Sequence, residues 1–235
     1  MSNVKSDLFK IARPITTDEN KYTYISSNYH LSNYRLISSG EVAVRGRNLD
    51  LPYYVREFIK DHDEVLMICN ILEDEVSGIV FRGLKEKAFI NYGFGKGSFY
   101  GIGDLDKNFK FGDLIVLVEG AIDRDVCKLF ITKNCLSCLT ANVSNNQLQV
   151  LSCLTNRVLL LLDNDEAGIN GEFNTKQKLN KAGITVYQIS KSSLIKDLGD
   201  LLELKRKNDP RANIVINAYR AQVQIHGGKV VWERL

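Results

Sequence analysis

Acidic residues follow apolar runs in the second half of the sequence, and their types and spacing suit metal-dependent phosphoryl chemistry. Glu119 directly follows Leu114–Val118, and an Asp-Asn-Asp-Glu-Ala-Gly segment follows Val158–Leu162. Carboxylates that crowd together repel one another unless a cation neutralises them, and oxygen ligands suit Mg²⁺ or Mn²⁺. A cation with open positions for phosphate oxygens supports nucleotidyl transfer or phosphodiester cleavage. The candidate metal ligands are Glu119, Asp123, Asp163, Asp165, Asp197 and Asp200.

Each acidic residue taken alone has a simpler interpretation, because Asp and Glu are common in loops and at helix N-termini. Asp123 and Asp165 in particular could serve as helix caps. One acidic pair would favour that interpretation. Acidic groups after several successive strands favour a shared metal site instead.

The elements that must position these acids are apolar runs alternating with amphipathic stretches from Asp113 onward. Near-continuous runs of Leu, Ile and Val indicate parallel strands covered on both faces, joined by right-handed helical crossovers. Ligands of such a sheet gather beyond the carboxyl ends of its strands. We therefore predict an α/β module with strands at Leu114–Val118, Leu136–Thr140, Val158–Leu162 and Ile184–Ile189, and helical stretches at Asp123–Lys133, Asn145–Leu154 and Gly168–Lys181.

The residues before this module have a different organisation. Short strand-like runs, Glu64–Ile71 and Val76–Phe81, lie among polar loops and aromatic residues, which indicates an α+β subdomain. Pro210 marks the expected end of the module, and one more helix or strand is expected after it. The predicted domains are 1–112, 113–209 and a tail at 210–235.

Composition sets broad limits on function. The chain has 235 residues, 44% of them hydrophobic, with 31 basic and 28 acidic side chains, a balance too even to demonstrate nucleic-acid binding. The N-terminus lacks the apolar core of a secretory signal, and the apolar runs are too short for a bilayer, so we expect a cytoplasmic protein with no membrane partner. Among five cysteines only Cys135 and Cys138 are close in sequence, so no zinc site is expected.

Two segments together resemble the signature of the TOPRIM family, which includes DnaG-type primases of bacteria and phages, topoisomerases and some nucleases. They are Val-Glu-Gly-Ala-Ile-Asp at Val118–Asp123 and Leu-Asp-Asn-Asp-Glu-Ala-Gly at Leu162–Gly168. The resemblance implies a Rossmann-like, mainly parallel fold with Glu119 as the catalytic glutamate. It also implies that Asp163 and Asp165 bind metal and that Asp197 with Asp200 forms a third acidic motif.

The segment before Glu119 is similar to the amino-terminal subdomain of the DnaG primase polymerase core. The matching stretches are Gly78–Arg82, Lys87–Asn91 and Lys96–Gly101, in the same order as in that family. The resemblance implies a groove for template backbone and nucleotide, formed by Arg82, Lys87, Asn91 and Lys96. Phe89 and Tyr100 could stack on bases or fill the core, and we expect core packing.

The resemblance implies a template-dependent RNA polymerase that makes short RNA primers on single-stranded DNA from ribonucleoside triphosphates. Two or more Mg²⁺ or Mn²⁺ ions would serve the reaction, and Glu119 would act as general base or as a metal-organising ligand. Nothing in the sequence resembles the zinc-binding or helicase-binding regions of a complete bacterial primase. We therefore expect a compact phage-type or plasmid-type primase or one part of a split primase. Its partners would be a replicative helicase or a separate zinc-binding subunit, in the host cytoplasm if a phage encodes it.

Other functions use the same acidic residues. A TOPRIM nuclease would direct them at a water nucleophile, although the primase-like segments would then have no explanation. A topoisomerase would need a further tyrosine-bearing domain. A non-catalytic nucleic-acid-binding accessory protein would have no need for the full set of acids.

Overall fold

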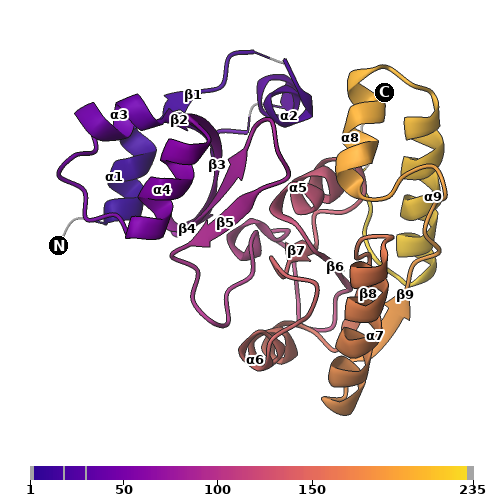
Figure 1. Cartoon of the computed structure of the whole chain (residues 1–235). Coiled ribbons are helices and arrows are strands. Elements are labelled where there is room, and N and C mark those ends of the chain that lie inside the picture. Colours follow the sequence, from indigo (N-terminus) through magenta and orange to yellow (C-terminus); the bar gives the residue numbers. More distant parts are fainter. Residues whose placement is uncertain (1–2, 18, 30, 232–235) are drawn as a thin grey trace. The chain divides into compact units, whose positions relative to one another are not determined.

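The computed structural model describes residues 3–17, 19–29 and 31–231. They divide into two compact units, Met1–Phe94 and Gly95–Leu235, and each is described by itself (Figure 1). None of the helices in these ranges is long and apolar enough to cross a membrane.

The first unit is built on an antiparallel sheet whose strands pair in chain order. Glu73 and Asp74 have positive φ angles, 51° and 62°, between its two longest strands. Such angles suit a tight hairpin, because they match the twist of the flanking strands. The strands are β1 (Arg13–Pro14), β2 (Tyr34–Ser38), β3 (Glu64–Leu72), β4 (Glu75–Gly83) and β5 (Phe89–Tyr92); the helices are α1 (Val4–Ile11), α2 (Lys21–Tyr29), α3 (Ser39–Val44) and α4 (Tyr53–Asp61).

Alternation along β4 and β5 divides their side chains between two faces of this sheet. Ile79 and Phe81 belong to the core of the unit, with Ile90 packed against it. Arg82 pairs with Phe89 in the register of the two strands. Because successive side chains of a strand point to opposite faces, Arg82 and Phe89 lie on the face away from this core.

The second unit contains the predicted parallel sheet, with strand order β7-β6-β8-β9. The α/β prediction is confirmed, although the strands are shorter than expected. Leu136–Thr140, for example, becomes a strand at Cys135–Ser137, because Leu139 has a φ of 60° that leaves the extended region. The elements are η1 (Ile102–Asp104), β6 (Ile115–Val118), α5 (Ala121–Phe130), β7 (Cys135–Ser137), α6 (Asn145–Leu154), β8 (Arg157–Leu160), α7 (Glu166–Lys181), β9 (Thr185–Gln188), α8 (Leu198–Arg206) and α9 (Arg211–Ile225).

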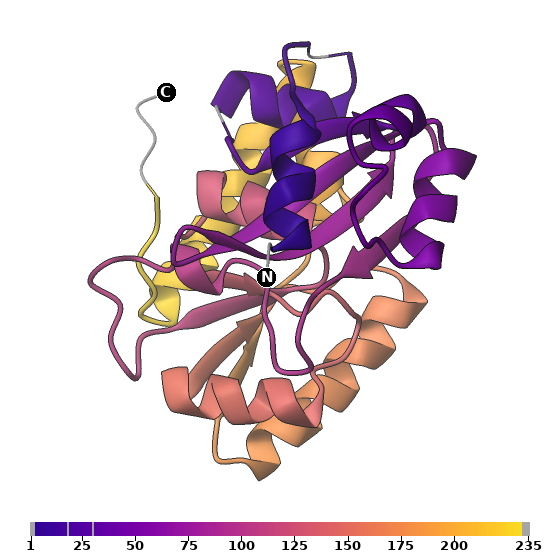
Figure 2. The same ribbon diagram turned by 90° about the vertical axis from the view of Figure 1, so that its left-hand side faces the viewer.

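Helices cover both faces of the parallel sheet. Helices α6 and α7 lie together on one side of it (Figure 2), where Leu151 and Leu179 share a buried cluster with Leu117 of β6. Helix α5 contacts β7 and α8, and α8 contacts α9. This double cover explains why the strands are apolar without alternation, and it leaves the strand ends as the place for polar chemistry.

Helix α9 lies in the segment that was expected to be a tail, and it packs into the second unit. The buried Arg220 donates from Nε to the backbone oxygen of Phe130 at 2.7 Å. Val215, Tyr219 and Val223 of the same helix are also buried. The additional element expected after Pro210, a helix or a strand, is a helix, and its apolar face is part of the core.

Candidate active site

The acidic candidates follow the carboxyl ends of adjacent parallel strands. Strand β6 ends at Val118, directly before Glu119, and β8 ends shortly before Asp163. A small pocket lies at this edge of the sheet. Its lining residues are Asp123, Leu161, Leu162, Asp163, Asn164, Lys191, Ile195, Lys196, Asp197, Leu198 and Tyr219.

Glu119 is half-buried and carries an unsatisfied oxygen. Its Oε2 is buried and has no hydrogen-bond partner among the described residues. Burial raises the pKa of this carboxyl, and the negative charges of Asp123 and Asp165 raise it further. Its backbone oxygen is held by Ser137 Oγ of the neighbouring strand at 2.6 Å. Glu119 is therefore fixed at its backbone and open at its carboxylate.

Asp163 shows most clearly that the acids share one locality. Burial raises its pKa to about 7, and the charges of Glu119, Asp197 and Asp165 act in the same direction. Like charges that raise the pKa of a carboxyl act from its own electrostatic surroundings. The structure thus brings together the acids that follow β6, β8 and β9.

Asp123 and Asp197 connect two helix starts. Asp123 lies in the first turn of α5, and its Oδ1 accepts a hydrogen bond from the backbone N–H of Gly199 at 3.1 Å. Asp197 caps α8, with its Oδ1 accepting from the backbone N–H of Asp200 at 2.7 Å. A Cβ on Gly120 would lie 2.5 Å from Asp123 Oδ2, so the glycine leaves room for that carboxylate.

Asp200 and Asp165 have clear local structural roles. Asp200 Oδ2 accepts from the backbone N–H of Lys196 at 2.9 Å. Asp165 is the N-cap of α7, and its Oδ1 accepts from the backbone N–H of Gly168 at 2.9 Å. The capping interpretation therefore holds for one oxygen of Asp165. A Cβ on Gly168 would lie 2.2 Å from the backbone oxygen of Asp163, so this glycine permits the close approach of helix and strand end.

Two lysines, Lys191 and Lys196, line the pocket, and the sequence analysis did not identify either as a site residue. Lys196 Nζ contacts the second oxygen of Asp165, Oδ2, at 2.9 Å. Lys191 Nζ contacts Glu172 Oε2 at 2.7 Å and donates to the backbone oxygen of Asp163 at 3.0 Å. The available sequence signal was the position of Lys196, which directly precedes the acidic motif that starts at Asp197.

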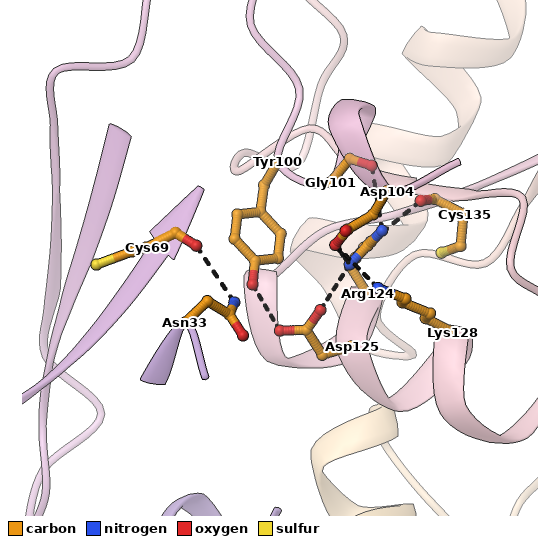
Figure 3. Close-up of polar contacts among 9 residues, drawn as sticks. All are labelled: Asn33, Cys69, Tyr100, Gly101, Asp104, Arg124, Asp125, Lys128 and Cys135. Carbon is orange, nitrogen blue, oxygen red and sulfur yellow. Dashed lines mark hydrogen bonds and ion pairs between the residues drawn. The ribbon is translucent and has the colours of Figure 1, made fainter. Parts of the chain in front are cut away.

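A buried polar network supports the start of the second unit (Figure 3). Arg124 is fully buried on α5, and it donates to the backbone oxygens of Gly101 and Cys135 and to the carboxylates of Asp104 and Asp125. Tyr100 Oη donates to Asp125 Oδ2 at 2.6 Å. Gly101 has a φ of 91°, and a Cβ there would lie 2.1 Å from Arg124 Nε.

Backbone hydrogen bonds between Tyr100 and Ser137 connect this network to the candidate site. Tyr100 and Ser137 exchange backbone hydrogen bonds of 3.1 Å in both directions, and Ser137 Oγ holds the backbone oxygen of Glu119. The Lys96–Gly101 segment, which sequence resemblance assigned to substrate binding, therefore also buttresses the loop that carries Glu119.

The residues predicted to bind template and nucleotide are divided between the two units. Arg82 and Asn91 lie on the sheet of the first unit, Lys87 lies in the exposed connection from β4 to β5, and the exposed Lys96 belongs to the second unit. Arg82 donates from Nη2 to Tyr22 Oη at 2.8 Å, and its guanidinium lies 4.6 Å from the centre of that ring. Arg82 Nε and Asn91 Oδ1 are buried and have no hydrogen-bond partner within the described ranges.

The expectation of core packing is right for Tyr100 and wrong for Phe89. Tyr100 is 1% exposed, whereas Phe89 is 53% exposed. Phe89 begins β5 opposite Arg82, on the sheet face away from the core, so the alternation of the strand directs it outward. In the register of the two strands Phe89 is the partner of Arg82, and Asn91 follows two residues later on the same face of β5.

Comparison with known proteins agrees with this geometry. Residues 116–202 match the Toprim-like family. This segment is similar to Toprim-like domains. It runs from Val116 in β6 through both acidic strand ends to Leu202 in the middle of α8, and it lies inside the predicted range 113–209. No curated protein matches the sequence.

Several solved structures similar to the chain are parts of primases. The zinc-binding and RNA polymerase domains of the Aquifex aeolicus primase are 25% identical, with 66% of this chain and 40% of that chain covered and a TM-score of 0.53. The E. coli primase catalytic core is 16% identical, with 93% and 79% covered and a TM-score of 0.62. A DnaG primase catalytic domain bound to single-stranded DNA is 15% identical, with 94% and 81% covered and a TM-score of 0.60.

These likenesses show that the chain has the fold of the DnaG-type primase catalytic core, with a Toprim-like domain in its second unit. The chain spans about two fifths of the Aquifex fragment, 40% of its length.

The carboxylates of the Toprim-like domain fit an oxygen-ligated cation, although they form no closed cage. Within the described part of the chain, no group of three or more His, Cys, Asp or Glu side chains is arranged to hold a metal ion. Mg²⁺ keeps several waters and is commonly bound through one or two carboxylates, so a cage is not required. The unsatisfied Oε2 of Glu119 and the raised pKa of Asp163 are what a site for a divalent cation provides.

Proposed function

We propose that the chain is a DNA primase of the DnaG type, a template-dependent RNA polymerase that makes short RNA primers on single-stranded DNA. The observation that supports this proposal is the position of Glu119 and Asp163 after neighbouring strands of the parallel sheet, where the charge of Glu119 acts on Asp163, in a chain with the fold of a primase catalytic core. In primer synthesis a ribonucleotide 3′-hydroxyl attacks the α-phosphate of an incoming triphosphate and pyrophosphate leaves.

The acidic residues have complementary roles in this proposal. A bound Mg²⁺ or Mn²⁺, in two or more copies, would neutralise the carboxylates and polarise the reacting phosphoryl group. Asp163, Asp165 and Asp197 would hold such ions, and Asp123 would support them from α5. Glu119 presents an unsatisfied oxygen and a raised pKa, so it suits either acceptance of the proton from the attacking hydroxyl or ligation of an ion.

The first unit supplies a candidate surface for template or nucleotide. Phe89 presents an exposed ring beside Arg82, whose Nε is unsatisfied, and Asn91 follows on the same strand. Aromatic rings stack on bases of any sequence, and Arg pairs with phosphate oxygens, so this combination suits a single strand. Lys87 and Lys96 would add contacts to the phosphate backbone.

Start-site recognition and recruitment would come from partners. A replicative helicase or a separate zinc-binding primase subunit would supply them, and the work would take place in the cytoplasm with the replication machinery. No zinc is assigned to this chain. The pKa values of buried Cys69 and Cys138 rise to about 12, which disfavours the thiolate form that binds zinc.

The decisive experiment measures synthesis and cleavage on one template. Wild-type protein, given single-stranded DNA, ribonucleotides and Mg²⁺ or Mn²⁺, should make short RNA, and Glu119→Gln should abolish synthesis without unfolding the chain. The isosteric substitution removes charge and keeps volume, so its effect reports on chemistry. Template cleavage that Glu119→Gln abolishes, with no synthesis even when helicase and a zinc-binding subunit are supplied, would replace this proposal with a nuclease.

A further inference from the structure

Lys196 lies at the centre of the acidic site, and its backbone is held on both sides. Its N–H donates to Asp200 Oδ2, and its backbone oxygen accepts from the N–H of Asn164, both at 2.9 Å. Its side chain is 46% exposed and ends 2.9 Å from Asp165 Oδ2. The fixed backbone therefore delivers an ammonium group to one oxygen of a candidate metal ligand.

The other oxygen of Asp165 is already in use. Oδ1 accepts from the backbone N–H of Gly168 as the cap of α7, which leaves Oδ2 as the oxygen turned to the site. An ammonium and a divalent cation cannot both contact one carboxylate oxygen without strong repulsion. Lys196 and a metal ion at Oδ2 therefore oppose each other.

The second lysine of the pocket has a different setting. Lys191 is 13% exposed, pairs with Glu172, itself 7% exposed, and donates to the backbone oxygen of Asp163, so it contacts the carboxylate of none of the candidate ligands. Lys191 is held as part of the structure, whereas Lys196 can leave its partner for solvent because its side chain is exposed.

We propose that Lys196 is a built-in counter-cation, which occupies Asp165 in the metal-free protein and competes with the divalent cation for that carboxylate. This inference rests on the proposed function, because it requires the acidic site to bind metal. Binding of the metal releases the ammonium group beside the site, where it can meet a phosphate oxygen of the nucleotide. Lys196 thereby couples metal loading to the exposure of a phosphate-binding cation.

The test is a calorimetric titration of the full chain with MnCl₂, without nucleotide or DNA. Lys196→Met keeps most of the side-chain length and removes the charge, and it should tighten Mn²⁺ binding by about three- to tenfold. Lys196→Arg keeps the charge and should bind Mn²⁺ as wild type does. Lys207→Met is the matched control, because Lys207 pairs with Glu203 at 3.2 Å beyond the far end of α8 and its loss changes the net charge equally.

Each outcome decides the inference. Tighter binding by Lys196→Met alone supports competition, including a change from undetectable to measurable binding. Equal or weaker binding by Lys196→Met, or an equal gain in Lys207→Met, overturns it. If wild type binds Mn²⁺ and Lys196→Met binds no tighter, only this inference falls. If no variant binds Mn²⁺, the metal-dependent function falls with it, whereas a chain that binds Mn²⁺ but makes no RNA contradicts the function alone.

Discussion

The carboxylate of Asp123 accepts a hydrogen bond from the backbone N–H of Gly199, so the first turn of α5 is fastened to the first turn of α8. The two residues are 76 positions apart in the chain. This bond places the third acidic motif, which starts at Asp197, against the one that contains Glu119. The acidic site is therefore assembled by helix starts as well as by strand ends.

Gly120→Ala should separate metal binding from folding. The added Cβ would approach only Asp123 Oδ2, the end of a side chain that can move, so we expect a stability cost of about 1 kcal/mol or less. The moved carboxylate should lose its bond to Gly199, and Mn²⁺ affinity should fall about tenfold. Calorimetry and chemical denaturation measure the two effects. Gly40→Ala on α3, where a Cβ would lie 3.9 Å from Ser38 Oγ, is the control and should leave Mn²⁺ affinity unchanged.

The stability of the metal-free protein should fall as pH rises toward neutrality. The pKa of Asp163 is about 7 in the folded protein against an ordinary value of 3.8, so folding takes up a proton between these two pH values. The contribution of the neutral carboxyl is fully present below the lower pKa and is lost as pH rises through the upper one. Because Asp163 is partly exposed, we expect a loss of about 1–2 kcal/mol.

Urea denaturation with chelator at pH 5 and pH 8 measures this loss. Asp163→Asn removes the titrating group, so its free energy of unfolding should change less between the two pH values than that of wild type. If the free energy of unfolding changes equally in wild type and in Asp163→Asn between pH 5 and pH 8, the raised pKa does not belong to Asp163.

Phe89→Ala should weaken binding to single-stranded DNA with little effect on stability. The ring is exposed, so its removal should cost about 0.5 kcal/mol or less, whereas loss of base stacking should cost about 1–3 kcal/mol of binding. Fluorescence anisotropy with a labelled oligonucleotide measures affinity, and thermal unfolding measures stability. A large drop in stability with unchanged affinity would assign the ring to packing.

Arg82→Ala and Lys96→Ala should weaken the same binding through charge. Each lost phosphate contact should reduce the slope of log affinity against log salt by about 0.7 for a single strand. Lys10→Ala is the control, because it also removes one positive charge, from an exposed side chain of α1 that pairs with Asp7. Unchanged affinity and slope in both variants would place the nucleic-acid groove elsewhere.

Arg124→Met should strongly destabilise the second unit. It leaves the buried carboxylate of Asp125 without its guanidinium partner, a change that costs about 3–5 kcal/mol. Asp104→Asn should cost far less, about 1 kcal/mol or below, because Asp104 is 48% exposed. Chemical denaturation measures both. Similar losses in the two variants would show that the buried pair contributes no more than the exposed one.

The sequence predicted those parts of the site that depend on the sheet. Apolar runs without alternation indicated buried parallel strands, and the carboxyl ends of such strands meet at one edge, so Glu119 and Asp163 could be placed together before any coordinates. The pairing of Lys196 with Asp165 depends on the path of the loop after β9, and no periodic pattern records that path. Phe89 was misplaced because an aromatic residue in a strand fits either face, and only the register with Arg82 settles which.

The packing of α9 determines where a stable fragment of the second unit can end. Tyr219 lines the acidic pocket and receives a hydrogen bond from the backbone N–H of Ser192 at 3.2 Å, while Arg220 holds the end of α5. A fragment that stops at Asp209 would lose a wall of the pocket and expose the apolar residues that α9 covers. Such a fragment should be poorly soluble, and proteases should cleave it in the loop before α8. A fragment that runs from Gly95 through α9 should resist the same proteases.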